Sequence, residues 1–210
     1  MKKWVILTGI IALFSLLTRT PGYWEVFSED TRRYETEVFY GVIREEYIAD
    51  NLGRRLLPSG FSDLQDGDIL VTDSTYCFLF RHGHAALVVD AKKGITLESY
   101  GIGTESCLSS VSEWRRYPHV MVLRLNASEE VRSAVAEYAK EKLIGIPYRL
   151  STGMIDDKDM GGAYWGTQCA HLVWAAFWQF GYDIDGDFGW LVTPADFVKS
   201  PLLRVVPQDQ

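Results

Sequence analysis

The residue best suited to nucleophilic chemistry is Cys169, which stands at the head of an apolar pattern of helical spacing that continues to Phe180. Thr167 precedes it and offers a capping hydroxyl, so the pattern predicts that Cys169 lies in the first turn of a buried helix. Unpaired N–H groups and the partial positive charge at a helix N-terminus favour a thiolate over a thiol. The position therefore suits a reactive cysteine, and it equally suits a small buried hydrophobe.

A cysteine nucleophile needs a base to take its proton, and the base needs an orienting partner on its second nitrogen. His84 and Glu98 are candidates for these roles because they flank a turn predicted at Ala91–Gly94. In a hairpin around that turn, the numbers of facing residues have a constant sum. A sum of 182 puts Glu98 opposite His84, and a sum of 184 puts it beside His84, opposite Ala86; both put the two side chains on one face. The alternative is a surface ion pair.

One further grouping resembles a zinc site. His82 shares the parity of His84, so these two histidines together with Glu98 and Cys169 offer zinc ligands. Gly83 is expected to break the strand between the histidines, and no second thiolate lies nearby, which argues against zinc. We expect no metal and no cofactor.

Asp183, Asp185 and Asp187 resemble the start of a calcium loop. Glycine falls at the fourth position of that loop, however, and Pro194 falls at the twelfth, where a bidentate glutamate is required. We interpret the series as a solvated turn. His171 receives no role from the sequence.

The elements that must position these residues follow from periodicity and from turn signals. Strands are predicted over Asp68–Thr72, His84–Val89, Ile95–Tyr100 and Val120–Leu125, with an edge strand over Leu202–Val206 and a strand or loop over Tyr76–Phe80. Helices are predicted over Glu29–Asn51, as an amphipathic helix, and from a Ser128 cap to about Ile144. This order predicts an α+β fold with an antiparallel sheet packed against helices.

Length and composition indicate one globular domain over residues 23–210. The chain has 210 residues, of which 47% are hydrophobic and 23% charged, and it shows no low-complexity segment. The net charge of -7 and the pI near 5.1 argue against a nucleic-acid partner, which would require a basic surface.

Residues 1–22 have the outline of an export signal, with Lys2 and Lys3 before an unbroken apolar run from Trp4 to Leu17. The run is shorter than the roughly 20 residues of a membrane-spanning helix, which favours a signal peptide over a permanent anchor. We therefore expect an exported protein that is periplasmic, extracellular or associated with a membrane through this N-terminal segment.

Export would expose the three cysteines of the chain to an oxidising compartment, where an odd number leaves at least one unpaired. Cys77 and Cys107 flank the predicted hairpin and are a candidate disulfide pair, which would leave Cys169 free. This hypothesis requires their Cα atoms to lie about 4.4–6.8 Å apart.

Several short stretches resemble the NlpC-type papain-like cell-wall peptidases, in the circularly permuted branch that includes the YiiX and YycO proteins and, more distantly, lecithin retinol acyltransferase. The matching stretches, in chain order, are Gly67-Asp68-Ile69-Leu70, Gly83-His84-Ala85-Ala86-Leu87-Val88, Leu97-Glu98, Gly145-Ile146-Pro147-Tyr148, Gln168-Cys169-Ala170-His171-Leu172-Val173-Trp174 and Thr193-Pro194-Ala195-Asp196. They span about Gly67 to Val206, and histidine before cysteine is the order of the permuted branch.

The resemblance implies a permuted papain-like fold and thiol-dependent cleavage of an amide bond, in a peptidoglycan stem peptide or an amino-acid amide. It implies that Cys169 is the nucleophile, His84 the base and Glu98 the orienting residue, and that the hydroxyl of Tyr148 helps to hold the oxyanion or the substrate. Two alternatives stay open. One is a lipid acyl hydrolase or acyltransferase, and the other is a non-catalytic module that binds peptides or amino acids in the same cleft.

Overall fold

The computed structural model describes residues 34–39, 43–50, 52, 54–57, 60–77, 80–153, 156–159 and 161–208. The predicted export segment, residues 1–22, lies outside these ranges. Within them, no helix combines the length and the apolar character that a membrane span requires.

Ten strands and a few helices make up the described part of the chain. The strands are β1 (Tyr34–Phe39), β2 (Ile43–Ile48), β3 (Ile69–Thr72), β4 (Thr75–Cys77), β5 (Phe80–Arg81), β6 (His84–Asp90), β7 (Ile95–Glu98), β8 (Cys107–Ser110), β9 (Met121–Leu125) and β10 (Leu203–Val206). The helices are the 3₁₀-helix η2 (Val111–Arg116) and the α-helices α2 (Glu129–Lys142), α3 (Cys169–Trp178) and α4 (Pro194–Lys199).

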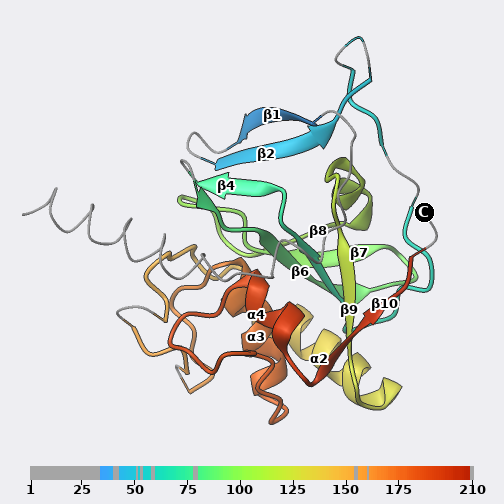
Figure 1. The fold of residues 1–210 in the computed structure, drawn as a ribbon. Helices are drawn as coiled ribbons and strands as arrows, with labels where there is room; N and C mark the ends of the chain where they lie inside the picture. The colour runs from blue at the N-terminus through green and yellow to red at the C-terminus, as the bar shows by residue number, and fades with distance from the viewer. Residues whose placement is uncertain are drawn as a thin grey trace, which may run out of the picture.

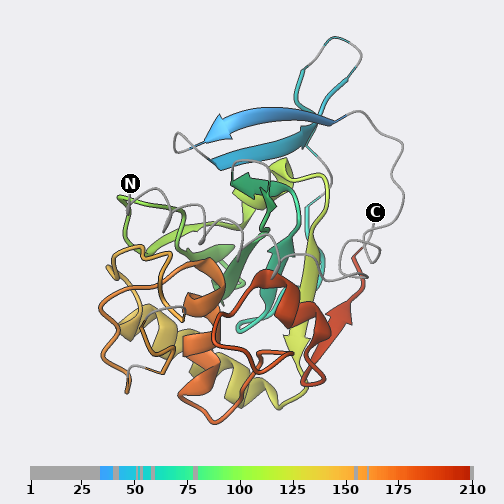
Figure 2. The ribbon, with the colours of Figure 1, turned by 60° about the vertical axis from the view of Figure 1, so that its left-hand side comes forward.

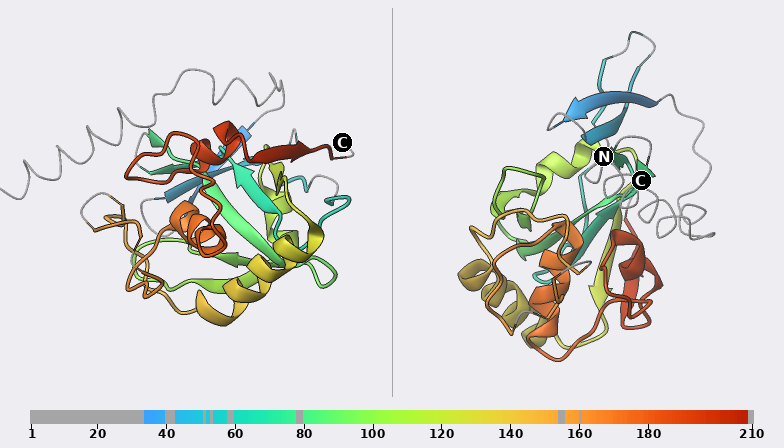
Figure 3. Two further views of the ribbon diagram at one scale, coloured as in Figure 1. Left: turned by 90° about the horizontal axis from the view of Figure 1, so that it is seen from below. Right: turned by 90° about the vertical axis from the view of Figure 1, so that its left-hand side faces the viewer.

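The strands form two sheets, in which all neighbouring strands are antiparallel (Figure 1). One sheet has four strands in the order β1-β2-β4-β5, and the other has six in the order β10-β9-β3-β6-β7-β8. The views in Figures 2 and 3 place the β1–β2 hairpin on the opposite side of the larger sheet from α2 and α3. The predicted α+β architecture, with an antiparallel sheet packed against helices, is confirmed.

Alternate residues of the central strands divide between two apolar cores, as the geometry of a strand requires. The core between the larger sheet and helices α2 and α3 includes Ile69, Val71, Leu87, Leu97 and Phe177. The core on the opposite face includes Leu70, Ala86, Val88, Trp114 and Tyr117. The same alternation assigns His84 and Glu98 to the face that carries η2. On β6, His84 lies two positions before Ala86 and shares its face, and on β7, Glu98 follows Leu97 and so points to the face opposite to it.

Local sequence signals located the elements of the larger sheet well. The predicted strands correspond to β3, β6, β7 and β9, and the predicted edge strand is β10 at one edge of the sheet. Helix α2 follows its predicted cap, since the Ser128 hydroxyl accepts a hydrogen bond from the Val131 N–H. Strand β8 and helices η2 and α4 were not predicted.

The predicted helix over Glu29–Asn51 is wrong. The structure has β1 and β2 in this segment, paired from Tyr34↔Ile48 to Phe39↔Ile43. The apolar spacing also fits a helix, but the segment is rich in aromatic and β-branched residues and contains Gly41 near its middle, features that favour strand–turn–strand. Strand β2 also pairs with β4, a partner that local periodicity cannot reveal.

The Gly67-Asp68 pair at the start of β3 has a structural explanation. Gly67 has a φ of +83°, and a Cβ there would lie 2.7 Å from the Arg132 carbonyl oxygen, so glycine is required. Asp68 is fully buried and accepts two hydrogen bonds from Arg124, at 2.7 Å from Nε and 2.8 Å from Nη2. This two-point ion pair joins the start of β3 to the neighbouring strand β9.

We expect Asp68→Asn to lower the free energy of unfolding by about 3–5 kcal/mol, because it removes the buried counter-charge of the Arg124 guanidinium and leaves only the exposed Asp63 carboxylate near it. The measurement is urea unfolding of the wild type and the variant. Asp63→Asn is the matched control, since the Asp63 carboxylate contacts the same guanidinium at 3.3 Å but its side chain is 67% exposed. That change should cost less than about 1 kcal/mol. Equal effects of the two substitutions would contradict the assignment.

Candidate active site

His84 is the first residue of β6, an inner strand of the larger sheet. Gly83 precedes it with a φ of +72°, and a Cβ at Gly83 would lie 2.7 Å from the Thr72 carbonyl oxygen. The glycine therefore allows the chain to turn sharply against β3 and to enter β6 with His84 buried. This agrees with the expected strand break at Gly83.

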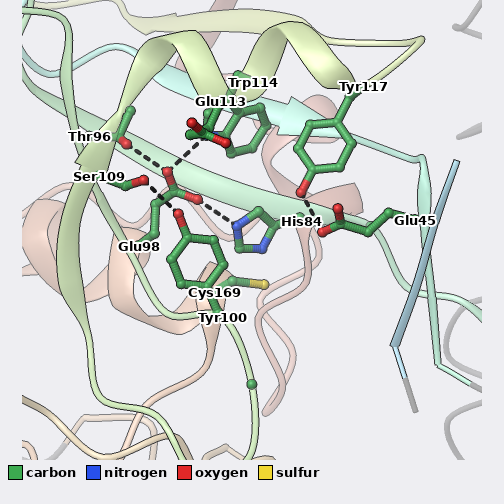
Figure 4. A network of polar contacts seen from close by, with 12 residues as sticks. Glu45, His84, Thr96, Glu98, Tyr100, Ser109, Glu113, Trp114, Tyr117 and Cys169 are labelled. Atoms are coloured by element: carbon green, nitrogen blue, oxygen red, sulfur yellow. Dashed lines mark hydrogen bonds and ion pairs between the residues drawn. The ribbon is translucent and has the colours of Figure 1, made fainter. Parts of the chain in front are cut away.

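Glu98, the last residue of β7, carries a buried carboxylate with three side-chain donors (Figure 4). Its Oε2 lies 2.9 Å from His84 Nε2, and its Oε1 accepts hydrogen bonds from Thr96 Oγ1 at 2.6 Å and from Trp114 Nε1 at 3.0 Å. Burial alone would raise the pKa of Glu98, but the hydrogen bond and charge of His84, with the Thr96 and Trp114 donors, lower it below its ordinary value. The group is therefore an ionised carboxylate that accepts at both oxygens.

The register of the hairpin agrees with the parity prediction. Leu87 faces Leu97 and Val88 faces Thr96, so the index sum is 184, one of the two values that place His84 and Glu98 on one face. A bulge shifts the register only beyond Val88, toward the turn. Because ionised Glu98 can only accept, Nε2 of His84 carries a proton, and Nδ1 is the nitrogen left for another partner.

Cys169 is the first residue of α3 and is buried, as predicted. The predicted cap was wrong: Gln168 caps the helix, and its Oε1 accepts a hydrogen bond from the Ala170 N–H at 2.9 Å. The Thr167 hydroxyl instead lies 2.9 Å from His171 Nδ1. Gln168 also donates from Nε2 to the Val192 carbonyl at 2.6 Å, so both the oxygen and the nitrogen of its side-chain amide are hydrogen-bonded.

The structure brings Cys169 and His84 together from elements 85 positions apart in the chain. Figure 4 shows the Cys169 sulfur beside the imidazole edge that Glu98 does not occupy. Burial alone would lower the pKa of His84, but hydrogen bonds to Cys169 and Glu98 and the charges of those groups outweigh it and raise the pKa to about 10. The three predicted residues form one continuous array of thiol, imidazole and carboxylate.

Two aromatic rings stack on the imidazole. The Trp114 ring lies 5.3 Å from the His84 ring at an interplanar angle of 15°, and the Tyr100 ring lies 5.7 Å away at 20°. The Tyr100 hydroxyl donates to Ser109 Oγ at 2.7 Å, which ties this ring to β8. The imidazole is thus confined by stacking as well as by its hydrogen bonds.

Tyr148 lies in the segment that runs beside the nucleophile. It forms an isolated parallel bridge with Thr167, two residues before Cys169, and its N–H donates to the Thr104 carbonyl at 2.8 Å. Its side chain is half-buried. The backbone of Tyr148 therefore lies beside the segment that leads into α3.

His82 is not part of the array. Its Nδ1 lies 2.6 Å from the Gly83 carbonyl oxygen, and burial lowers its pKa to about 4. Among the described residues, the one group with three mutually close ligand atoms of the kind that hold metals consists of Asp185, Asp187 and Asp196, within 4.8 Å of one another. Asp185 in that group pairs with Lys158 at 2.6 Å.

The candidate disulfide is not formed, because Cys107 is a free, exposed cysteine. It lies on β8 directly opposite Glu98, whereas Cys77 lies on β4 of the four-stranded sheet. The hypothesis relied on both residues flanking one hairpin in sequence, and the structure assigns them to different sheets.

Sequence reasoning missed two side chains that complete the site, Thr96 and Trp114. Thr96 had a usable signal, because it lies two positions before Glu98 on the same strand and so on the same face. Trp114 had none, since a tryptophan in the polar segment Ser112–Arg116 reveals neither the 3₁₀-helix nor the carboxylate that its indole contacts.

Comparisons of the chain with protein-family models, with curated proteins and with solved structures gave no match.

We expect Glu98→Gln to lower the pKa of His84 and to destabilise the fold by roughly 1–3 kcal/mol. A carboxamide has one acceptor oxygen, so its NH₂ group must face either the His84 N–H or the Thr96 and Trp114 donors. NMR titration of the His84 ring and urea unfolding measure the two effects. Since the pKa of His84 is raised from 6.5 to about 10, its contribution to stability is present below pH 6.5 and lost as the pH rises toward 10.

The control for Glu98→Gln is Glu113→Gln, which removes one carboxylate charge from an exposed side chain next to Trp114 in sequence. It should leave the His84 titration unchanged. A His84 midpoint that stays the same in Glu98→Gln would contradict the proposed pairing.

A second pH effect concerns His171, whose buried ring lies 2.9 Å from Thr167 Oγ1 and 2.9 Å from the Lys158 carbonyl oxygen. Burial lowers its pKa to about 4, against 6.5 for an unperturbed histidine. Its contribution to stability is therefore present above pH 6.5 and lost as the pH falls toward 4. Unfolding free energies measured from pH 7.5 to 5.5 should fall less steeply in His171→Gln than in the wild type. Identical slopes would contradict this assignment.

Proposed function

We propose that the chain is an exported cysteine hydrolase that cleaves amide bonds, with Cys169 as nucleophile, His84 as base and Glu98 as orienting carboxylate. The observation that carries the proposal is the buried array in which one imidazole joins a helix-terminal thiol to an ionised carboxylate. A purely structural ion pair has no need of a thiol on the second imidazole nitrogen. The array has the form of nucleophile, base and orienter that acyl transfer requires.

In the proposed reaction, the proton of the thiol passes to His84, and the imidazolium stabilises the resulting thiolate. The sulfur attacks the substrate carbonyl carbon and forms a tetrahedral intermediate. His84 then donates its proton to the leaving amine as the C–N bond breaks, which leaves a thioester on Cys169. Water, deprotonated by His84, attacks the thioester; the carboxylic acid leaves and the Cys169 thiolate is regenerated. Glu98 remains ionised throughout and holds the imidazole through Nε2–H.

The developing oxyanion needs hydrogen-bond donors. The N–H of Cys169 is one candidate, because the first residue of a helix has no acceptor for it within the helix. The hydroxyl of Tyr148 is the second candidate, as the resemblance to the permuted peptidases implies. The backbone of Tyr148 is bridged to Thr167, which supports a place near the start of α3.

The order of the elements supports membership of the circularly permuted papain-like branch. A strand histidine and a hairpin carboxylate come first, and a helix with an N-terminal cysteine follows. Peptidoglycan stem peptides or other amino-acid amides are the substrate class that the resemblance implies, and no cofactor is needed for the chemistry. The export signal expected at residues 1–22 is consistent with a substrate outside the cytoplasm.

A lipid acyl hydrolase or acyltransferase is the second candidate function, and one observation favours it. Large apolar side chains are exposed on segments connected to the nucleophile: Trp165 is 53% exposed and Trp190 is 83% exposed. Trp165 lies four residues before Cys169, and the segment of Trp190 is tied to Gln168 through the Val192 carbonyl. Exposed tryptophans of this kind suit contact with an apolar substrate.

We expect Cys169→Ala to lower the rate of substrate hydrolysis by about 1,000-fold or more, because it removes the nucleophile, while the fold is retained. Amino-acid amides and purified peptidoglycan fragments serve as substrates for one assay, with new amino groups measured and products identified by mass spectrometry. A lipid extract, with release of fatty acids measured, serves for the other. The assay in which the wild type is active decides between amide and lipid chemistry.

Cys107→Ser is the matched control, since it removes a free, exposed thiol instead of the buried one. It should retain wild-type turnover. Undiminished turnover by Cys169→Ala would refute the assignment of the nucleophile. A wild type that binds these compounds without converting any of them would instead indicate a non-catalytic binding module.

A further inference from the structure

We infer that helix η2 is a positioning element of the catalytic pair: Trp114 fixes both Glu98 and His84, and Glu45 of the other sheet holds η2 in place. This inference rests on the proposed function, because it assigns the role of η2 relative to Cys169, His84 and Glu98. It adds residues that supply no reacting group.

Trp114 contacts both members of the pair with different parts of one side chain. Its indole N–H donates to Glu98 Oε1 at 3.0 Å, and its ring stacks on His84 with centroids 5.3 Å apart. Glu98 uses its other oxygen for His84, so the indole limits rotation of the carboxylate while the ring limits tilting of the imidazole.

Helix η2 depends on support from outside itself. A 3₁₀-helix of six residues has poor hydrogen-bond geometry and little stability of its own. At its start, Ser110 Oγ accepts from the Ser112 N–H, and Ser110 belongs to β8, an edge strand of the larger sheet. This cap fixes only one end of η2, so the other end needs a second anchor.

Glu45 of β2 supplies the second anchor. Its Oε1 accepts a hydrogen bond from the Tyr117 hydroxyl at 2.8 Å, and its Oε2 lies 3.2 Å from Arg116 Nε. The carboxylate is buried, so these contacts are shielded from water. Tyr117 in turn packs edge-to-face on Trp114, with ring centroids 5.3 Å apart.

The contacts therefore run without a gap from the four-stranded sheet to the imidazole, through Glu45, Tyr117, Trp114 and His84, as Figure 4 shows. The four-stranded sheet thus bears on the geometry of the site although it contributes no reacting group. The β1–β2 hairpin, which was wrongly predicted as a helix, thus helps to position the catalytic pair through Glu45.

The test measures how fast iodoacetamide alkylates Cys169 as a function of pH, with all variants in a Cys77→Ser and Cys107→Ser background that leaves Cys169 as the one cysteine. No substrate is required. The acid limb of this profile reports formation of the thiolate beside ionised Glu98 and protonated His84. Trp114→Phe keeps an aromatic ring and removes one hydrogen bond to the carboxylate. The limb should move to higher pH, by less than the roughly one unit expected for a group that itself loses one hydrogen bond, because Glu98 acts on the thiolate only through His84.

Trp174→Phe is the matched control. Trp174 is also fully buried and also donates its indole N–H to a carboxylate, Asp183, at 2.8 Å. It does not contact His84 or Glu98, so its acid limb should match the wild type. Tyr117→Phe removes only the hydroxyl that reaches Glu45 and should shift the limb in the same direction as Trp114→Phe by a smaller amount.

A double variant separates positioning from general packing. If Trp114 acts through Glu98, then adding Trp114→Phe to Glu98→Gln should change the alkylation rate by less than about 2-fold relative to Glu98→Gln alone. Additive effects, or a wild-type acid limb in Trp114→Phe, would overturn the inference. If Trp114→Phe does not fold, an unshifted limb in folded Tyr117→Phe overturns it. A wild type with no reactive thiolate near neutral pH would refute the proposed function itself, a different result.

Discussion

The buried charge of Glu98 is the constraint on which the rest of the site depends. An ionised carboxylate inside a protein is costly unless its oxygens are matched by donors, and Glu98 meets this condition with His84, Thr96 and Trp114. The three donors come from β6, β7 and η2. Satisfying one carboxylate therefore fixes the register of the β6–β7 hairpin, the placement of η2 and the orientation of the imidazole together.

The predicted pairing of His84 with Glu98 succeeded because strand geometry has a strict period. Side chains alternate between faces, so any even index sum sets both residues on one face, and the observed sum of 184 is even. The caps, turns and apolar runs that define β3, β6, β9 and α2 are also local, because each depends on residues within a few positions of one another. These parts of the fold and the central pair of the site were accessible from sequence.

The parts that could not be predicted depend on partners distant in the chain. Residues Tyr34–Ile48 fit helical spacing by themselves, but they form two paired strands, of which β2 also pairs with the more distant β4. Trp114 reaches Glu98 only because β8 pairs with β7 and carries η2 to that face. Gln168 rather than Thr167 caps α3, and the Gln168 side chain is held in place by the Val192 carbonyl, 24 positions along the chain. In each case a tertiary contact outweighs the local preference.

His82 and His84 illustrate what separates a base from a structural histidine. They lie two positions apart, His84 buried and His82 half-buried, and desolvation opposes the charged form of each. His82 contacts a backbone carbonyl, which does not compensate for burial, and its pKa falls to about 4. His84 has a thiol on one nitrogen and a carboxylate on the other, and its pKa moves the opposite way. Burial strengthens each electrostatic interaction, but the partners of a histidine determine whether its pKa rises or falls. The chemistry of this site therefore depends on the groups that β7, η2 and α3 bring to the His84 ring.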